Sequence, residues 1–238
     1  MKIVILFFAF FIHYSIQAFN HTLAVDFVHL ADIAYCNKTA FENWNCGDDC
    51  SHFPKGQILP LYYNIKPTLT GSIGYVMFAD VTNKFLVFTF RGTTTSYQLF
   101  WEICNEVNVA YTLHQIPDAV VMKYFYNHYL DVREDFKSHF LQFRSQFPDY
   151  TVVFTAHSLG AGLLTHAAMD AILSGWVPGN QSIMYTFGSP RVGNLAFAQK
   201  LVNSISEIWR ITHWKDFAPH VPLCKKEKGV CITGEGQK

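Results

Sequence analysis

The stretch Tyr150-Thr-Val-Val-Phe-Thr-Ala-His-Ser-Leu-Gly-Ala-Gly162 decides how this chain of 238 residues folds. Its first half is rich in β-branched and aromatic residues, a composition typical of a buried strand. Its second half places small residues around Ser158 and continues into helix-forming residues. The pattern predicts a strand, a sharp turn and a helix, with the Ser158 hydroxyl exposed at the turn. Small residues are needed on both sides because the strand and helix backbones nearly touch there.

A serine at such a turn is the nucleophile of many α/β hydrolases. Ala156 occupies the first glycine position of that motif, which is tolerable because alanine is the next smallest residue, and the more demanding Gly160 is intact. A lone serine is a weak nucleophile, so this interpretation requires a base and an oxyanion hole elsewhere in the chain. The alternative is that Ser158 only caps the following helix.

The rest of the chain alternates strand-like and helix-like segments. Apolar runs at residues 74–81 and 85–91, separated by Thr82-Asn83-Lys84, predict a β-hairpin. Further elements are expected at residues 119–147 (helix), 182–187 (strand), 192–204 (helix) and 207–214 (strand). This alternation predicts an α/β fold with a mostly parallel sheet and helices on both faces, and the initial hairpin makes the sheet mixed.

Two further segments have a distinct character. Residues 23–35 have apolar residues at helical spacing and predict an amphipathic helix. Residues 36–72 contain three cysteines and are expected to be irregular.

Within residues 119–147, phenylalanines recur every three or four positions, which predicts a helix face packed into the core. These are Phe136, Phe140, Phe143 and Phe147.

The N-terminus predicts a secretory signal peptide over residues 1–18, followed by a single domain over residues 19–238. Lys2 precedes an apolar block from Ile3 to Ile12, which is too short to cross a bilayer. Cleavage is expected after Ala18, and no transmembrane segment would remain. The alternative is a short anchor helix that stays in place.

The cysteine count agrees with export, because an even number suits an oxidising compartment. The candidates for disulfides are Cys36, Cys46, Cys50, Cys104, Cys224 and Cys231. Local loops favour Cys224–Cys231 and one bridge within the first three cysteines, but the sequence alone does not choose among the pairings. Zinc binding at Cys46 and Cys50 is the alternative, although no second ligand pair with suitable spacing follows.

Glycosylation and charge give weaker indications. Sequons for N-glycosylation begin at Asn20, Asn37 and Asn180, which suits a secreted surface. The formal net charge is zero and no basic stripe occurs, so we expect no nucleic-acid partner.

Four motifs occur in one order along the chain. They are Phe88-Thr-Phe-Arg-Gly-Thr93, the stretch around Ser158, Tyr185-Thr-Phe-Gly-Ser-Pro-Arg-Val-Gly-Asn194 and Arg210-Ile-Thr-His-Trp-Lys-Asp-Phe-Ala-Pro-His-Val-Pro222. In this order and spacing the chain resembles the class 3 (fungal-type) lipases, an α/β-hydrolase family, and particularly its secreted, cysteine-containing animal members. The resemblance covers roughly residues 23–231. It implies a secreted carboxylic-ester hydrolase that acts on lipid esters at a membrane or droplet interface, without metal or cofactor.

The resemblance also implies individual roles. Ser158 is the nucleophile, and Asp216, just after the last predicted strand, is the triad acid; a turn residue before a proline-rich loop is the alternative for Asp216. Thr93 and the N–H of Leu159 form the oxyanion hole. Residues 94–109 occupy the family's lid position, with an ordinary amphipathic helix as the alternative, and Cys104 would tether this segment.

The catalytic histidine of the family lies several tens of residues after the triad acid, whereas His220 is the only histidine after Asp216 in this chain. His220 matches a loop position of the family, and His157, His166 and His213 are expected to be structural. We therefore expect a C-terminally incomplete fold, from a truncated gene model or splice product of an active lipase. The alternatives are a catalytically inactive, secreted lipid- or glycan-binding protein and a fragment that does not fold alone.

Overall fold

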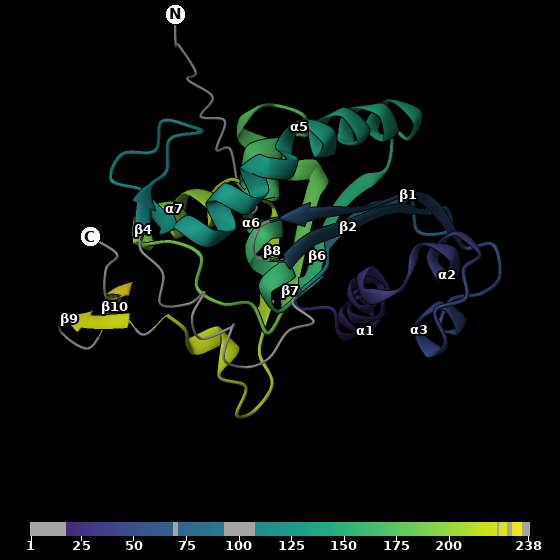
Figure 1. The fold of residues 1–238 in the computed structure, drawn as a ribbon, viewed down its shortest axis with the longest axis horizontal. Coiled ribbons are helices and arrows are strands. Elements are labelled where there is room, and N and C mark those ends of the chain that lie inside the picture. The colour runs from purple at the N-terminus through teal and green to yellow at the C-terminus, as the bar shows by residue number, and fades with distance from the viewer. Residues whose placement is uncertain (1–17, 69–70, 93–107, 223, 228–229, 235–238) are drawn as a thin grey trace, which may run out of the picture.

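The computed structural model describes residues 18–68, 71–92, 108–222, 224–227 and 230–234. Its centre is a six-stranded sheet in the order β1-β2-β3-β6-β7-β8 (Figure 1). The first three strands are antiparallel, and β3, β6, β7 and β8 run parallel. The strands are β1 (Ile58–Thr68), β2 (Gly71–Asp80), β3 (Phe85–Phe90), β6 (Thr151–His157), β7 (Ser182–Phe187) and β8 (Glu207–Ile211).

Helices cover both faces of this sheet. On one face α1 (His21–Asp32) packs against β6, near the short α2 (Lys38–Glu42) and α3 (Asp48–Ser51). On the other face lie α5 (Lys123–Gln146), α6 (Leu159–Leu173) and α7 (Leu195–Val202), with α5 packed along α6 (Figure 1). The α/β fold with a mixed, mostly parallel sheet and helices on both faces is thus confirmed. Two small hairpins accompany it, β4 (Asn108–Ala110) with β5 (Val120–Met122) and β9 (Cys224–Glu227) with β10 (Val230–Gly234).

The prediction of an irregular segment over residues 36–72 is wrong. This segment contains α2, α3 and the whole of β1, a strand of 11 residues. Pro60 and Pro67 obscure the strand in the sequence, because proline cannot donate to a ladder of hydrogen bonds. They are tolerated because β1 lies at the edge of the sheet, and the register shifts between Pro60 and Tyr62.

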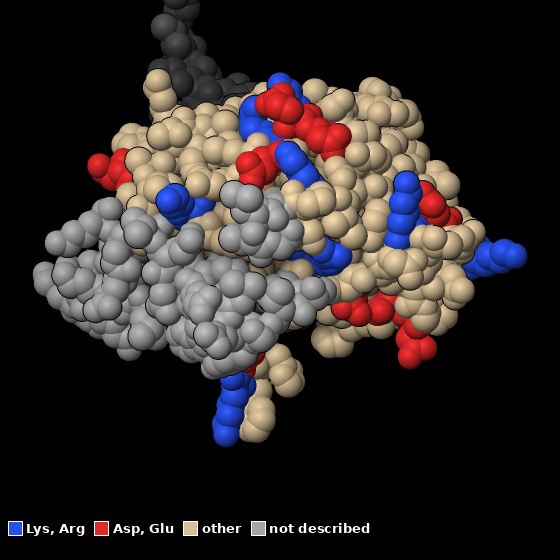
Figure 2. All heavy atoms as spheres, viewed as in Figure 1, with Lys and Arg blue, Asp and Glu red and all other residues tan. Residues whose placement is uncertain are grey.

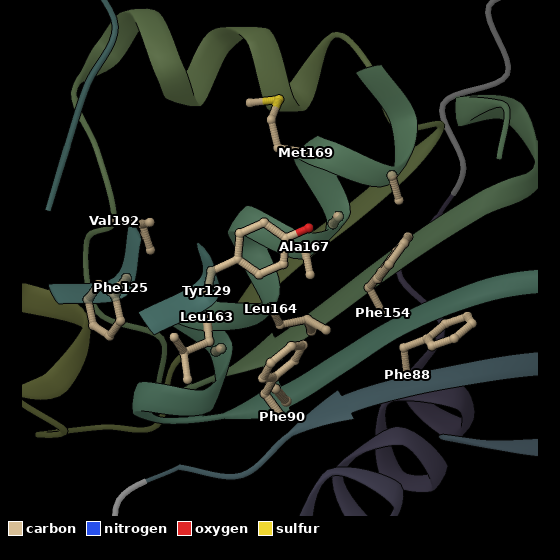
Figure 3. Packing of buried hydrophobic residues seen from close by; sticks show 14 of the residues in the cluster. Phe88, Phe90, Phe125, Tyr129, Phe154, Leu163, Leu164, Ala167, Met169 and Val192 are labelled. Carbon is tan, nitrogen blue, oxygen red and sulfur yellow. The ribbon is translucent and has the colours of Figure 1, made fainter. Parts of the chain in front are cut away.

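The larger core lies between the sheet and the helices α5, α6 and α7. Phe88 of β3 stacks on Phe140 of α5 with ring centroids 4.4 Å apart, and Phe154 of β6 completes the aromatic layer. In Figure 3, Phe88, Phe90 and Phe154 project from the strands toward the side where Leu163 and Leu164 of α6 pack. The predicted core role of the phenylalanine stripe on α5 is therefore confirmed, with Phe136 and Phe140 fully buried.

A fully buried carboxylate ties the helices together. Asp170 of α6 accepts hydrogen bonds from Arg133 and Tyr129 of α5, from Ser174 and from His114 in the loop before β5. Burial favours the neutral acid, but the hydrogen bonds from these four residues outweigh it and lower the pKa of Asp170. The loop that precedes β5 is thereby fixed to α6.

The surface carries charges of both signs. On the face shown in Figure 2, lysine and arginine are scattered among aspartate and glutamate, with no stripe of one sign. Within the described residues, no helix is long and apolar enough to cross a membrane.

Candidate active site

Ser158 lies between the end of β6 and the start of α6, in a strained backbone conformation with φ 56° and ψ −131°. Its N–H donates to the Phe187 carbonyl at 2.9 Å, which fastens the turn to β7. A positive φ is uncommon for a non-glycine residue, and such strain is concentrated at functional sites. The Ser158 side chain does not cap α6, so the alternative role as a helix cap is not seen.

Gly160 brings this turn close to the end of β3. A Cβ at Gly160 would lie 2.2 Å from the Phe90 carbonyl oxygen and 2.8 Å from the Gly92 nitrogen. Contacts this short with backbone atoms cannot be relieved by a change of side-chain rotamer. The glycine therefore sets how near the nucleophile turn lies to the segment that leads to Thr93.

Asp216 lies in the loop after β8, and its two carboxylate oxygens have different surroundings. Oδ1 accepts the Ala218 N–H at 2.9 Å, which closes a turn within the loop. Oδ2 lies against Gly188, where a Cβ would approach it to 2.8 Å. Gly188 follows β7 and has φ 58°, so both conformation and space favour glycine there. The structure thus brings Asp216 to the ends of β7 and β8, beside the ring of His157.

Two arginines hold the loop that carries Asp216. Arg191 Nη1 donates to the carbonyls of His220 and Pro222, each at 2.7 Å. Arg210 Nη2 donates to the Ser189 carbonyl at 2.6 Å and the Pro219 carbonyl at 2.7 Å. Both arginines lie within the family motifs of the sequence, but no role was predicted for either.

Tyr35 links the N-terminal helical segment to the nucleophile turn. Its hydroxyl lies 3.0 Å from His157 Nδ1 and accepts a hydrogen bond from the Gly92 backbone. Burial, followed by the charge of Asp32, raises the pKa of Tyr35 to about 12, so the phenol stays protonated. The residue was not predicted, because a contact between positions so far apart in the chain leaves no local pattern.

The ring of His157 lies near Asp216, whose negative charge acts on it, and Gly188 adjoins both residues. Desolvation of the ring lowers its pKa, and the negative charge of Asp216 opposes this only in part. Its ring contacts Tyr35 and approaches Gly188. Within the described residues, the Ser158 hydroxyl makes no hydrogen bond to His157 or to any other histidine.

His166 and His213 are the other histidines that were predicted to be structural, and His220 was assigned to a loop. His166, inside α6, is fully buried, whereas His213 and His220 are exposed. Both ring nitrogens of His166 lack a hydrogen-bond partner, and burial lowers its pKa to about 3. His166 is surrounded by the rings of Tyr111, Tyr126, Tyr129 and Phe197.

The expected bridge within the first three cysteines is not formed. Cys36, Cys46 and Cys50 are free thiols, with Cys46 in hydrogen-bond contact with both others. Burial is the main cause that raises the pKa of Cys46, so this thiol remains protonated. In the part of the chain that the structure describes, no group of three or more metal-ligating side chains is arranged to hold a metal ion.

Several predicted features lie outside the described residues. These are Thr93, most of the lid segment 94–109, Cys104 and the side chains of Cys224 and Cys231. Of the oxyanion donors, only Leu159 is described. It is the first residue of α6 and directly follows Ser158, so its N–H belongs to the free donors at a helix start.

Comparison with known proteins gives consistent matches. The chain is 32% identical over 160 residues to secreted mono- and diacylglycerol lipase A of Penicillium cyclopium, covering 66% of this chain and 48% of that protein. It is 30% identical over 199 residues to a lipase of Rhizopus niveus, covering 81% of this chain and 48% of that protein. The chain thus spans about half the length of the curated relatives that it matches.

A solved structure shares the fold. Rhizomucor miehei triacylglyceride lipase superposes with a TM-score of 0.74 at 23% identity, covering 85% of this chain and 74% of that chain. The model of the family described as Lipase (class 3) matches residues 87–226, which include Ser158, Gly188 and Asp216. The chain therefore belongs to the class 3 lipase family.

Proposed function

We propose that this protein is a secreted carboxylic-ester hydrolase that acts on acylglycerols or related lipids at a membrane or droplet interface. The observation that carries the proposal is the geometry of Ser158, held at positive φ between β6 and α6 without a capping bond. The printed name of the Penicillium relative, a mono- and diacylglycerol lipase, supports the substrate class.

In the proposed reaction the Ser158 hydroxyl attacks the ester carbonyl, and water later releases the acyl group from the enzyme. The Leu159 N–H and Thr93 would stabilise the negative charge on the carbonyl oxygen. Asp216 would orient a histidine through Oδ2, because Oδ1 is already bonded to the Ala218 N–H. That histidine would remove the proton of Ser158 and return it to the leaving alcohol.

A second candidate function is that of a catalytically inactive lipid-binding protein. The lack of any hydrogen bond between Ser158 and a histidine in the described residues favours it. A serine hydrolase without its base keeps only the residual catalysis of the oxyanion hole and of binding.

Covalent labelling by a fluorophosphonate separates the two candidates. We expect the probe to label Ser158 in the wild-type chain, or in a chain extended along the transcript, and to leave the Ser158→Ala variants of both unlabelled. Labelling of the extended chain alone would place the base downstream of residue 238. A folded protein that stays unlabelled in both lengths, and still binds vesicles of phosphatidylcholine and diacylglycerol, would contradict the hydrolase proposal.

Export and glycosylation belong to the same proposal, since the Penicillium relative is named as secreted. Residues 1–18 would be removed as a signal peptide. Asn20, Asn37 and Asn180 are all exposed, and the first two cap α1 and α2 through Oδ1. The amide nitrogen to which a glycan attaches is not used in these caps. Expression in eukaryotic cells should release the protein into the medium with its N-terminus near Phe19. Its electrophoretic mobility should increase after glycosidase treatment.

A further inference from the structure

A second concave site lies on the α7 side of the sheet, away from the nucleophile turn. It has a volume of about 300 Å³, at the lower end of the range for small-molecule pockets. Side chains of α7, β7 and β8 and the loop after β7 line it, including Met184, Val192, Phe197, Leu201, Val202 and Ile208. Ser158, Leu159 and Asp216 are not among the lining residues, so this pocket is distinct from the candidate active site.

The walls of this pocket are apolar and its mouth is open to solvent. Val202 is 54% exposed although it belongs to the lining, and β8 is the last strand of the sheet, with no further strand beside it in the described residues. Covering this concave apolar surface with an alkyl chain removes apolar area from water and is therefore favourable.

Two guanidinium groups lie in the same lining. Arg191 and Arg210 both line the pocket, and neither forms an ion pair within the described part of the chain. Burial lowers the pKa of Arg210, the positive charge of Arg191 lowers it further, and the negative charge of Asp216 raises it in part. Their known bonds are to backbone carbonyls and use only Nη1 of Arg191 and Nη2 of Arg210. A guanidinium carries five N–H donors and is well suited to bind a carboxylate through paired hydrogen bonds.

We propose that this pocket binds a free fatty acid, with the alkyl chain between α7 and β8 and the carboxylate at Arg191 and Arg210. The charge complementarity selects this ligand, because an apolar pocket with two arginines that form no ion pair in the described residues matches an amphiphile with one anionic end. A neutral lipid would fill the apolar part but would bring no negative charge to the two arginines. Binding at this pocket is independent of ester hydrolysis, since it requires neither Ser158 nor a base.

Binding of decanoate and decanol to the Ser158→Ala chain tests the charge complementarity. Isothermal titration below the critical micelle concentration should show decanoate bound at least about tenfold more tightly than decanol, as expected for a charge-assisted hydrogen bond. Each methylene added between octanoate and decanoate should strengthen binding by up to about fourfold. Equal affinity for decanoate and decanol would overturn the proposal.

A pair of variants on α7 tests the location. Ala198 lines the pocket, whereas Leu195 is exposed on the same helix outside the lining. Ala198→Trp should weaken decanoate binding at least about tenfold, and Leu195→Trp should leave it unchanged. Equal effects of the two variants, or none, would contradict the proposed site.

Photo-crosslinking tests the location without a substitution. A decanoate analogue with a diazirine at the end of its chain should label residues 195–202 of the wild-type protein, before and after Ser158 is blocked with a fluorophosphonate. Labelling confined to the neighbourhood of Ser158, or loss of labelling after Ser158 is blocked, would assign the fatty acid to the active site. Either result would refute a second binding site. Since this outcome does not depend on hydrolysis, failure here is distinguishable from failure of the proposed function.

Discussion

At the scale of single residues, the candidate site depends on residues beside the predicted catalytic ones as well as on the catalytic residues themselves. Gly188 leaves room for Asp216, and Tyr35 joins Gly92 to His157. Neither role could be predicted from the sequence, whereas Ser158 and Asp216 could be proposed from their motifs. A motif is a local pattern, but the space beside a carboxylate is set by a strand elsewhere in the chain.

Substitution of Gly188 tests the packing around the triad acid. Gly188→Ala places a methyl group 2.8 Å from Asp216 Oδ2 at a residue with φ 58°. We expect the free energy of unfolding in urea to fall by about 2–4 kcal/mol, from backbone strain plus overpacking. The matched control is Gly175→Ala, which has φ 72° but open space around the new methyl group and should cost only about 1–2 kcal/mol. Equal losses for the two variants would contradict a steric role of Asp216.

Removal of the Tyr35 hydroxyl tests the link to the nucleophile turn. Tyr35→Phe leaves the Gly92 N–H and His157 Nδ1 without their shared partner. We expect the rate of fluorophosphonate labelling at Ser158 to fall about tenfold, which corresponds to ~1.4 kcal/mol for the loss of the hydrogen bonds that the hydroxyl makes. Tyr63→Phe, which removes a hydroxyl bonded to the Cys36 carbonyl, is the control and should leave labelling unchanged.

At the scale of elements, the close approach of α6 to β3 positions the nucleophile. The elements β2, β3, β6 and β7, together with α5 and α6, were predicted well because each has a strong apolar period or run. The strand β1 was missed because its prolines are acceptable only at a sheet edge, and the edge is a property of the assembled sheet. Its partner β2 supplies the pairing that its own sequence does not indicate.

Gly160 is the test of this close approach. Gly160→Ala forces a Cβ to within 2.2 Å of the Phe90 carbonyl oxygen, so α6 or β3 must move. We expect a loss of at least about 3 kcal/mol in the free energy of unfolding, together with loss of labelling at Ser158. Gly162→Ala is the comparison, because its Cβ would meet the Phe125 ring at 2.6 Å, a side chain that can move in part. A smaller loss for Gly160→Ala than for Gly162→Ala would refute the backbone contact.

At the scale of the whole molecule, the core contains an ionisable group that couples folding to pH. His166 is fully buried among aromatic rings with no hydrogen-bond partner. Burial lowers its pKa to about 3, whereas the unfolded chain takes up the proton near pH 6.5. Protons therefore bind preferentially to the unfolded chain between these values.

The expected result is a protein that loses stability in acid. The free energy of unfolding should be independent of this group above about pH 6.5 and should fall by about 1.4 kcal/mol per pH unit below it, until about pH 3. His166→Phe should flatten this dependence and raise stability at pH 7, because it removes two unsatisfied nitrogens from an aromatic environment. Urea unfolding between pH 7 and pH 4 measures both effects. His220→Gln, a change at an exposed site, is the control, and an identical slope in wild type and His166→Phe would contradict the assignment.

The sequence by itself determined the α/β class, the order of most elements, the family and the nucleophile turn. These follow from apolar periodicity and from a motif whose residues are neighbours in the chain. Only the tertiary structure decided that β1 forms the sheet edge, that Tyr35 contacts His157, that Oδ2 of Asp216 lies against Gly188 and that two arginines line an apolar pocket. The physical reason is that these features depend on distances between segments far apart in the chain, which packing of the sheet and its helices sets and which no local pattern encodes.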